Sequence, residues 1–176
     1  MKFKELICLI RSDIYKYKQK KELKNSLSLL FNKSFIVVFL YRVCHYLYKS
    51  ENKILLFPFV SLFRIVKERR YIDISYKTSI GEALYIDFAF GIALNEFIKI
   101  GNNVELYQCT TIGASGRDKS YGPEIGDNVI LKPGSVVIGH CKVGNNVIVE
   151  ANSVITKDIP DDSTVIGIPN IISTNV

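Results

Sequence analysis

The chain has 176 residues, of which 48% are hydrophobic and 23% are charged, and this ordinary globular composition excludes a disordered chain. Its net charge of +6 is the sum of a basic N-terminal part and an acidic C-terminal part. Residues 1–70 carry 16 Lys and Arg against 5 Asp and Glu, a net charge of +11, whereas residues 71–176 carry 7 against 12, a net charge of −5. We therefore expect one region over 1–70 and a second domain over 71–176.

The four cysteines predict neither a metal site nor a disulfide framework. Cys8, Cys44, Cys109 and Cys141 lie far apart and form no CxxC pair or Cys/His cluster. Free thiols are typical of a reducing compartment. The first residues, MKFKELICLIRSDIYKYK, mix charges with apolar residues and lack the apolar core of a signal peptide. We expect a cytoplasmic protein.

Residues 1–70 read as helices. The segment 12–31 has leucines at helical spacing, with Ser12 as its expected N-cap. Two more apolar segments, 33–50 and 53–71, are also expected to be helical. The first of these has an apolar run of about 15 residues, short of the ~20 needed to cross a membrane, and it contains Arg42.

Two interpretations of this basic helical region stay open. In the first, the helices pack on one another and cap the domain that follows. In the second, a basic face rich in Tyr and Phe rests on an anionic membrane surface, which would make the protein membrane-peripheral. Nucleic-acid binding is not expected, because the basic residues are mixed into helical patterns and no binding motif appears.

From residue 72 onward, aliphatic residues recur every six positions. They are Ile74, Ile80, Ile86, Ile92, Ile100, Leu106, Ile112, Ile125, Leu131, Val137, Val143, Val149 and Ile155, with wider steps before Ile100 and Ile125. Because six is even, successive aliphatics can point to the same side of extended chain. A period of six with small residues between predicts short strands joined by corners and stacked as a solenoid of about four coils over 72–168.

The repeat IGDNVILKPGSVVIGHCKVGNNVIVEANSVITKDIPDDSTVIGIP resembles the hexapeptide-repeat acyltransferases. Within that family it is most similar to the serine acetyltransferase-like branch, which includes polysaccharide O-acetyltransferases. The segments YRVCHYLY, IDISYKTSIG and IGNNVELYQCTTIGASG carry the same resemblance. It implies a mainly β fold, a left-handed parallel β-helix preceded by a small α-helical region. It also implies a homotrimer with sites between subunits.

The resemblance implies that a histidine after an Asp acts as general base and that a second carboxylate orients it. Asp73 matches the orienting carboxylate and Asp87 matches the Asp, but Phe88 stands at the position of the histidine. Tyr121 and Gly122 stand where an Arg-His pair would hold serine. Asp87 is the nearest substitute, although an ordinary carboxylate with a pKa near 4 is a weak base.

The positions that match the CoA-binding groove of the family are better preserved than those that match its catalytic residues. They are Gly134, Ser135, Ala151, Asn152, Thr156 and Lys157. The resemblance therefore implies acetyl-CoA as acetyl donor, without a metal.

We expect an acetyl-CoA-dependent O-acetyltransferase that acts on a sugar hydroxyl in surface polysaccharide biosynthesis. One alternative is a serine O-acetyltransferase-like enzyme of cysteine biosynthesis. The other is a catalytically impaired hexapeptide-repeat protein that only binds CoA or a partner.

Overall fold

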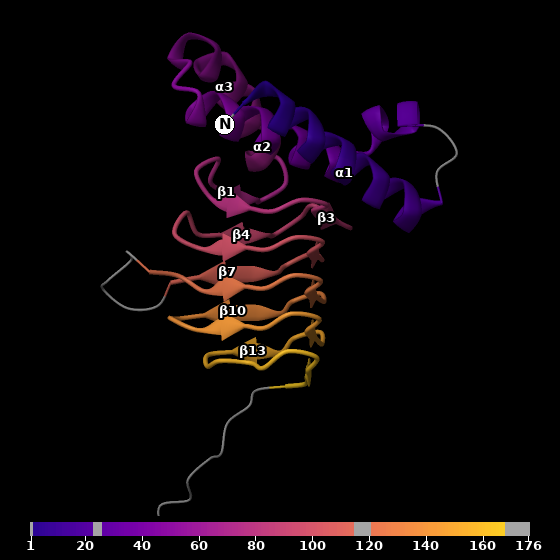
Figure 1. The fold of residues 1–176 in the computed structure, drawn as a ribbon, viewed down its shortest axis with the longest axis vertical. Coiled ribbons are helices and arrows are strands. Elements are labelled where there is room, and N and C mark those ends of the chain that lie inside the picture. The colour runs from indigo at the N-terminus through magenta and orange to yellow at the C-terminus, as the bar shows by residue number, and fades with distance from the viewer. Residues whose placement is uncertain (1, 23–25, 115–120, 168–176) are drawn as a thin grey trace, which may run out of the picture.

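A computed structural model describes residues 2–22, 26–114 and 121–167. Helices α1 (Phe3–Lys21), α2 (Lys33–Lys49) and α3 (Lys53–Glu68), with the 3-10 helix η1 (Ser26–Phe31), precede every strand (Figure 1). The strands are β1 Asp73–Ile74, β2 Ser79–Ile80, β3 Tyr85–Ile86, β4 Ala93–Leu94, β5 Lys99–Ile100, β6 Glu105–Leu106, β7 Thr111–Gly113, β8 Glu124–Ile125, β9 Ile130–Leu131, β10 Val136–Ile138, β11 Lys142–Val143, β12 Ile148–Val149, β13 Val154–Ile155 and β14 Thr164–Val165.

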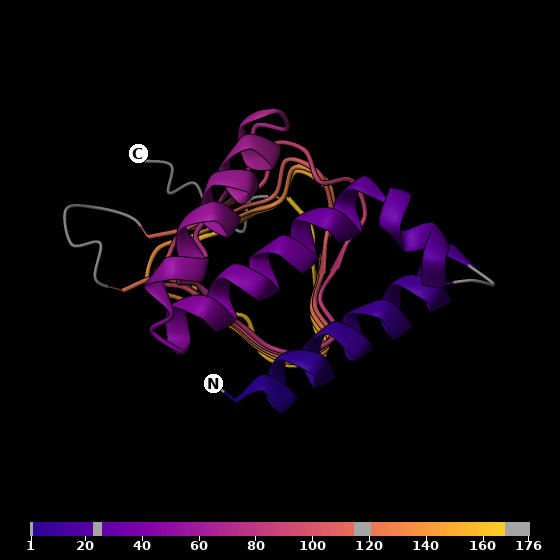
Figure 2. The ribbon, with the colours of Figure 1, turned by 90° about the horizontal axis from the view of Figure 1, so that it is seen from above.

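The strands form three parallel sheets. Sheet A has the order β1-β4-β7-β10-β13, sheet B has β11-β8-β5-β2, and sheet C has β14-β12-β9-β6-β3. From β1 to β13 each strand pairs with the strand three places along the chain, so one coil contributes one strand to each sheet. Viewed from above, the coils superimpose as a triangle (Figure 2).

The predicted period of six is confirmed by burial, with one error of register. All the aliphatic residues of the period are buried. However, Leu94 and not Ile92 holds the core position of strand β4. The extra two residues therefore lie between Ile86 and Leu94, in the corner that contains Phe88. Sheets A and C each have five strands, so the stack has nearly five coils where about four were predicted.

Each coil turns from sheet B to sheet C in a tight corner. A Cβ added at Gly81 would lie 2.6 Å from the carbonyl oxygen of Gly101 in the next coil, so only glycine fits. Asn128 and Asn146 have positive φ in these corners, and Asn128 Nδ2 donates to Asn146 Oδ1 at 2.9 Å. These contacts hold neighbouring coils in register.

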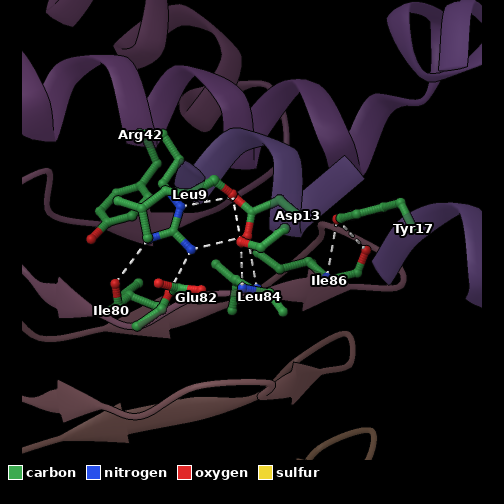
Figure 3. Close-up of polar contacts among 12 residues, drawn as sticks. Leu9, Asp13, Tyr17, Arg42, Ile80, Glu82, Leu84 and Ile86 are labelled. Carbon is green, nitrogen blue, oxygen red and sulfur yellow. Dashed lines mark hydrogen bonds and ion pairs between the residues drawn. The ribbon is translucent and has the colours of Figure 1, made fainter. Parts of the chain in front are cut away.

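The helices cover the open end of the first coil, as the first interpretation predicted. Arg42 forms an ion pair with Asp13 at 2.8 Å and also donates to the carbonyl of Ile80 (Figure 3). The Tyr17 hydroxyl donates to the Ile86 carbonyl at 2.9 Å and accepts from the Ile86 amide at 3.0 Å. Side chains of α1 and α2 thus satisfy backbone groups that no further coil is present to satisfy.

The expected N-cap at Ser12 is wrong. Helix α1 begins at Phe3, where the Lys2 amide donates to the Glu5 carboxylate at 3.0 Å, and Ser12 lies inside the helix. Among the helices that the structure describes, none is long and apolar enough to span a membrane. The domain boundary at residues 70–71 stays a prediction, because helices and coils share one continuous buried cluster.

Candidate functional site

The corner between sheets C and A, here called corner CA, brings most of the predicted site residues into one column. It contains residues 87–92, 107–110, 132–135 and 150–153 of four successive coils. The Cys109 amide donates to the Phe90 carbonyl at 2.9 Å, and the Gly134 amide donates to the Gln108 carbonyl at 3.0 Å. Phe88 therefore lies at one end of the column and Asn152 toward the other.

Asp87 is held by two donors at the upper end of corner CA. Lys21 of α1 donates to its carboxylate, and the Tyr85 hydroxyl donates to the same oxygen at 2.7 Å. Burial alone would raise the pKa of the Asp87 carboxyl, but the hydrogen bonds from Lys21 and Tyr85 outweigh burial and lower the pKa. A carboxylate stabilised in its charged form is a poor proton acceptor.

Phe88 is exposed beside this ion pair. Its side chain is 61% exposed, and the Lys21 ammonium lies 5.5 Å from the ring centroid. A phenyl ring has no group that can accept a proton. The upper end of corner CA therefore offers a cation and an apolar ring where the resemblance implied an imidazole.

Asp73 lies apart from Asp87, on the outer face of sheet A. Its side chain is 90% exposed and lies 3.5 Å from Lys67 Nζ of α3. Asp73 and Arg64 line a pocket of about 470 Å³ between α3 and the first coil. An exposed ion pair of this kind contributes little to stability, so the Asp73 carboxylate stays available to a ligand.

Lower in corner CA, small residues follow one another and two buried polar side chains lack hydrogen-bond partners. Gly134 and Asn152 both have positive φ, and a Cβ added at Gly134 would collide with Asn152 Oδ1. Within the described ranges, Ser135 Oγ and Gln108 Oε1 are buried without a hydrogen-bond partner. Exposed Ala151 completes this stretch. Ser135 is fully buried, so the surface that an extended ligand arm could reach here is made by Ala151, Asn152 and the backbone around Gly134.

Thr156 and Lys157 do not join this column. They follow β13 in the corner between sheets A and B, here called corner AB. Tyr121 and His140 lie in the same corner, with ring centroids 5.8 Å apart. Corner AB also holds a small pocket of about 100 Å³ beside Gly122. The two groups of predicted residues thus flank sheet A, and one chain does not bring them together.

Sequence reasoning missed Lys21, Tyr85 and Cys109. Tyr85 is two residues before Asp87 in extended chain, so their side chains share a side, and that spacing could have predicted the contact. Cys109 is exposed in corner CA with positive φ. No sequence signal links Lys21 to Asp87, which is 66 residues away. No group of side chains that could hold a metal ion occurs in the part of the chain that the structure describes.

Residues 122–157 match the model of the family described as bacterial transferase hexapeptide (six repeats). A serine acetyltransferase of Staphylococcus epidermidis is 37% identical over 131 residues, which cover 72% of this chain and 59% of that protein. The chain thus spans about three fifths of the length of this curated relative.

Two solved structures share the fold. Soybean serine acetyltransferase complexed with serine is 28% identical, with a TM-score of 0.81 over 94% of this chain and 66% of that one. A serine acetyltransferase in complex with CoA is 25% identical, with a TM-score of 0.79 over 95% of this chain and 69% of that one.

These similarities correct the expected function. The prediction of a sugar acceptor in polysaccharide biosynthesis is wrong, because the relatives and the solved structures are serine acetyltransferases. The alternative, a serine acetyltransferase-like enzyme, agrees better with them. The hexapeptide-repeat part of the predicted resemblance is confirmed.

Proposed function

We propose that this chain, which carries the hexapeptide repeat of bacterial transferases, is an acetyl-CoA-dependent O-acetyltransferase of the serine acetyltransferase type. It would transfer the acetyl group to the hydroxyl of serine or of a similar small amino acid. A relative at 37% identity and a solved structure with bound CoA support the proposal. Left-handed winding of the coils is part of the same proposal.

The observation that carries the proposal is the column in corner CA. Small and exposed residues run from Ala151 and Asn152 past Gly134 toward Phe88. Such a surface suits the pantetheine arm of acetyl-CoA, which has two amides and little width. The thioester would then lie near Phe88, beside the Lys21–Asp87 pair.

We further propose a homotrimer with sites between subunits. Corner CA contributes Gly134, Ser135, Ala151 and Asn152, while Thr156 and Lys157 lie at corner AB of the same chain. Both corners flank sheet A, so a neighbouring copy would have to bring its own corner AB toward corner CA. A complete CoA site would then need two chains.

Acetyl transfer in this site would depend on positioning. Phe88 cannot accept the proton of the attacking hydroxyl, and Lys21 already stabilises the charge on Asp87. Holding the acceptor and the thioester together still lowers the barrier, because it replaces a bimolecular encounter. We therefore expect slow turnover, with the proton passing to water.

A second candidate function is binding of CoA or a partner without catalysis. The specific observation that favours it is Phe88, an exposed apolar ring at the position of the expected base. Under this candidate the groove would bind CoA equally well, and acetyl transfer would be absent.

The test follows release of CoA thiol from acetyl-CoA in the presence of serine, together with a thermal shift in CoA alone. The proposal expects both signals, and at a hundredfold excess over the dissociation constant CoA should stabilise the fold by ~2.7 kcal/mol. Stabilisation without thiol release would select the second candidate, and absence of both would reject the two together.

A matched pair of variants checks where CoA binds. Ala151→Phe fills the exposed part of corner CA and should abolish the thermal shift. Ser79→Phe adds the same ring on exposed sheet B and should leave the shift unchanged. Equal effects of the two variants would contradict a groove in corner CA. Sedimentation equilibrium should give the mass of three chains, and a monomer at micromolar concentration would contradict the shared site.

A further inference from the structure

A third pocket, of about 380 Å³, lies where α2, α3 and corner CA meet. Its lining residues come from the start of α2, from the end of α3 and the two residues after it, and from corner CA. They are Lys33, Ile36, Val66, Arg69, Arg70 and Phe90. The pocket thus combines three cations with an apolar wall, and no acidic residue lines it.

Among the residues that the structure describes, the three cations have no anionic partner. None of the ion pairs found there involves Lys33, Arg69 or Arg70. Nearby cations of α3 are paired, since Lys67 lies 3.5 Å from Asp73 and Arg64 lies 3.3 Å from Glu68. Three unpaired cations around one pocket repel one another, and a bound anion would relieve that repulsion.

Helix stability explains only part of this arrangement. Arg69 and Arg70 follow the last turn of α3, where a positive charge interacts favourably with the helix dipole. Lys33 is the first residue of α2, where the same dipole disfavours a positive charge. The position of Lys33 at the start of α2 therefore does not stabilise the helix.

We infer that this pocket binds a phosphate monoester whose organic part rests on Phe90. At neutral pH a phosphate monoester carries a charge of about −1.5 to −2 and three acceptor oxygens, which matches three cationic donors better than a single carboxylate does. The volume exceeds what a bare phosphate fills and lies in the range of small-molecule sites. Ile36, Val66 and the half-exposed Phe90 ring offer an apolar surface to the remainder of the ligand.

The pocket adjoins the upper end of corner CA. The Gly91 amide donates to the Arg70 carbonyl at 3.1 Å, and the Phe90 amide donates to the Phe88 carbonyl at 2.9 Å. A phosphorylated ligand in this pocket would therefore lie close to the proposed acetyl-transfer site. Its binding requires no acetyl-CoA, so this inference and the proposed activity succeed or fail separately.

The experiment uses phenyl phosphate as probe and titrates the full chain by calorimetry at pH 7.5 and constant ionic strength. Phenyl phosphate should bind, and Lys33→Gln and Arg70→Gln should each weaken it by about tenfold, the usual effect of losing one hydrogen bond to a charged group. Arg11→Gln, a change of an exposed cation in α1, should leave binding unchanged. Phe90→Ala should weaken phenyl phosphate more than inorganic phosphate.

Several results would overturn the inference. They are absence of binding, equal losses in Arg11→Gln and Arg70→Gln, and displacement of the probe by serine. Displacement by serine would assign the cations to an acceptor carboxylate. Vesicles that contain phosphatidic acid test whether the phosphate belongs to a lipid headgroup or to a soluble ligand. If the protein sediments with these vesicles and Arg70→Gln abolishes the sedimentation, the pocket binds the phosphate of a lipid headgroup.

Discussion

The helical cap and the coil stack both satisfy the backbone groups of the coils, but with different partners. Inside the stack, each coil bonds to the next through a repeated set of backbone hydrogen bonds, as where the Ile130 amide donates to the Val147 carbonyl at 2.9 Å, and through repeated side-chain contacts such as that of Asn128 with Asn146. At the first coil, the partners are side chains: Arg42 for the Ile80 carbonyl, Asp13 for the Leu84 amide and Tyr17 for Ile86. The stack repeats one solution, whereas the cap uses a different residue at every position.

This difference predicts where the fold is most sensitive to substitution. A contact in the stack is repeated in the coils above and below, so these equivalent contacts partly compensate when one of them is lost. A contact in the cap has no equivalent, and several of its members are charged and buried. The cap should therefore contain the single positions whose substitution lowers the free energy of unfolding most.

The largest expected effect is that of Arg42→Leu in the cap. The change leaves the Asp13 carboxylate buried without its cation, which typically costs about 3–5 kcal/mol. It also removes the donor to the Ile80 carbonyl. Chemical denaturation monitored by circular dichroism measures the loss.

The control for this prediction is Arg64→Leu in α3. Arg64 pairs with Glu68 on the exposed side of the helix, so its loss should cost well under about 1 kcal/mol. Similar losses in the two variants would mean that the buried pair does not hold the cap in place.

The next effect is expected in the stack, where Leu131→Ala should cost roughly 2–5 kcal/mol. Leu131 is fully buried between the three sheets, so truncation leaves a cavity. The adjacent Ile130 points outward, and Ile130→Ala should cost clearly less. If Ile130→Ala were the more damaging change, the side of the chain assigned to the core would be wrong.

The third prediction concerns Phe88, at the boundary between cap and stack. Phe88→His introduces a proton acceptor beside the proposed thioester position, and it should raise acetyl transfer to serine at least tenfold, within the ~10²–10⁴ typical of general-base assistance. Phe88→Leu keeps an apolar side chain and should give no increase. Thiol release at saturating acetyl-CoA measures both variants.

A fall in rate with Phe88→His would contradict this prediction. It would mean that another group accepts the proton and that the phenyl ring helps to bind the acceptor. Phe31→His, which changes an exposed phenylalanine of η1 outside the proposed site, should leave the rate unchanged and so excludes a general effect of added imidazole.

The period of six made the stack predictable because each side of a coil buries one aliphatic residue. The single error of register had a physical cause. Ile92 and Leu94 are both aliphatic and both buried, so the period could not identify which residue occupies the core position of β4. The two extra residues were consequently placed between Ile92 and Ile100, whereas they lie in corner CA, between Ile86 and Leu94.

The cap and the candidate site were less predictable. Asp13 and Arg42 are 29 residues apart on different helices, and no spacing rule joins them. The motif positions of corner CA could be found from the resemblance, because they belong to the repeat. Lys21 could not, since its contact with Asp87 depends on how α1 lies across the first coil.

The smallest expected effect is a pH dependence of the cap. His45 of α2 contacts the Tyr76 carbonyl through Nδ1 at 2.8 Å, and burial lowers the pKa of the imidazole below its ordinary value of 6.5. The neutral ring is therefore the form that the folded state favours. A lowered pKa contributes stability above the unfolded pKa, and this contribution is lost as pH falls below about 6.5 toward the folded pKa.

The free energy of unfolding should thus decrease between pH 7 and pH 5. The chain has only two histidines, so one substitution at each tests which of them carries the slope. His45→Gln should flatten it, because glutamine keeps an N–H donor for the Tyr76 carbonyl and does not titrate. His140→Gln, in exposed corner AB, should preserve it. A slope that persisted in His45→Gln and vanished in His140→Gln would place the pH sensitivity in the stack. The stack, and not the cap, would then be the region that mild acid destabilises.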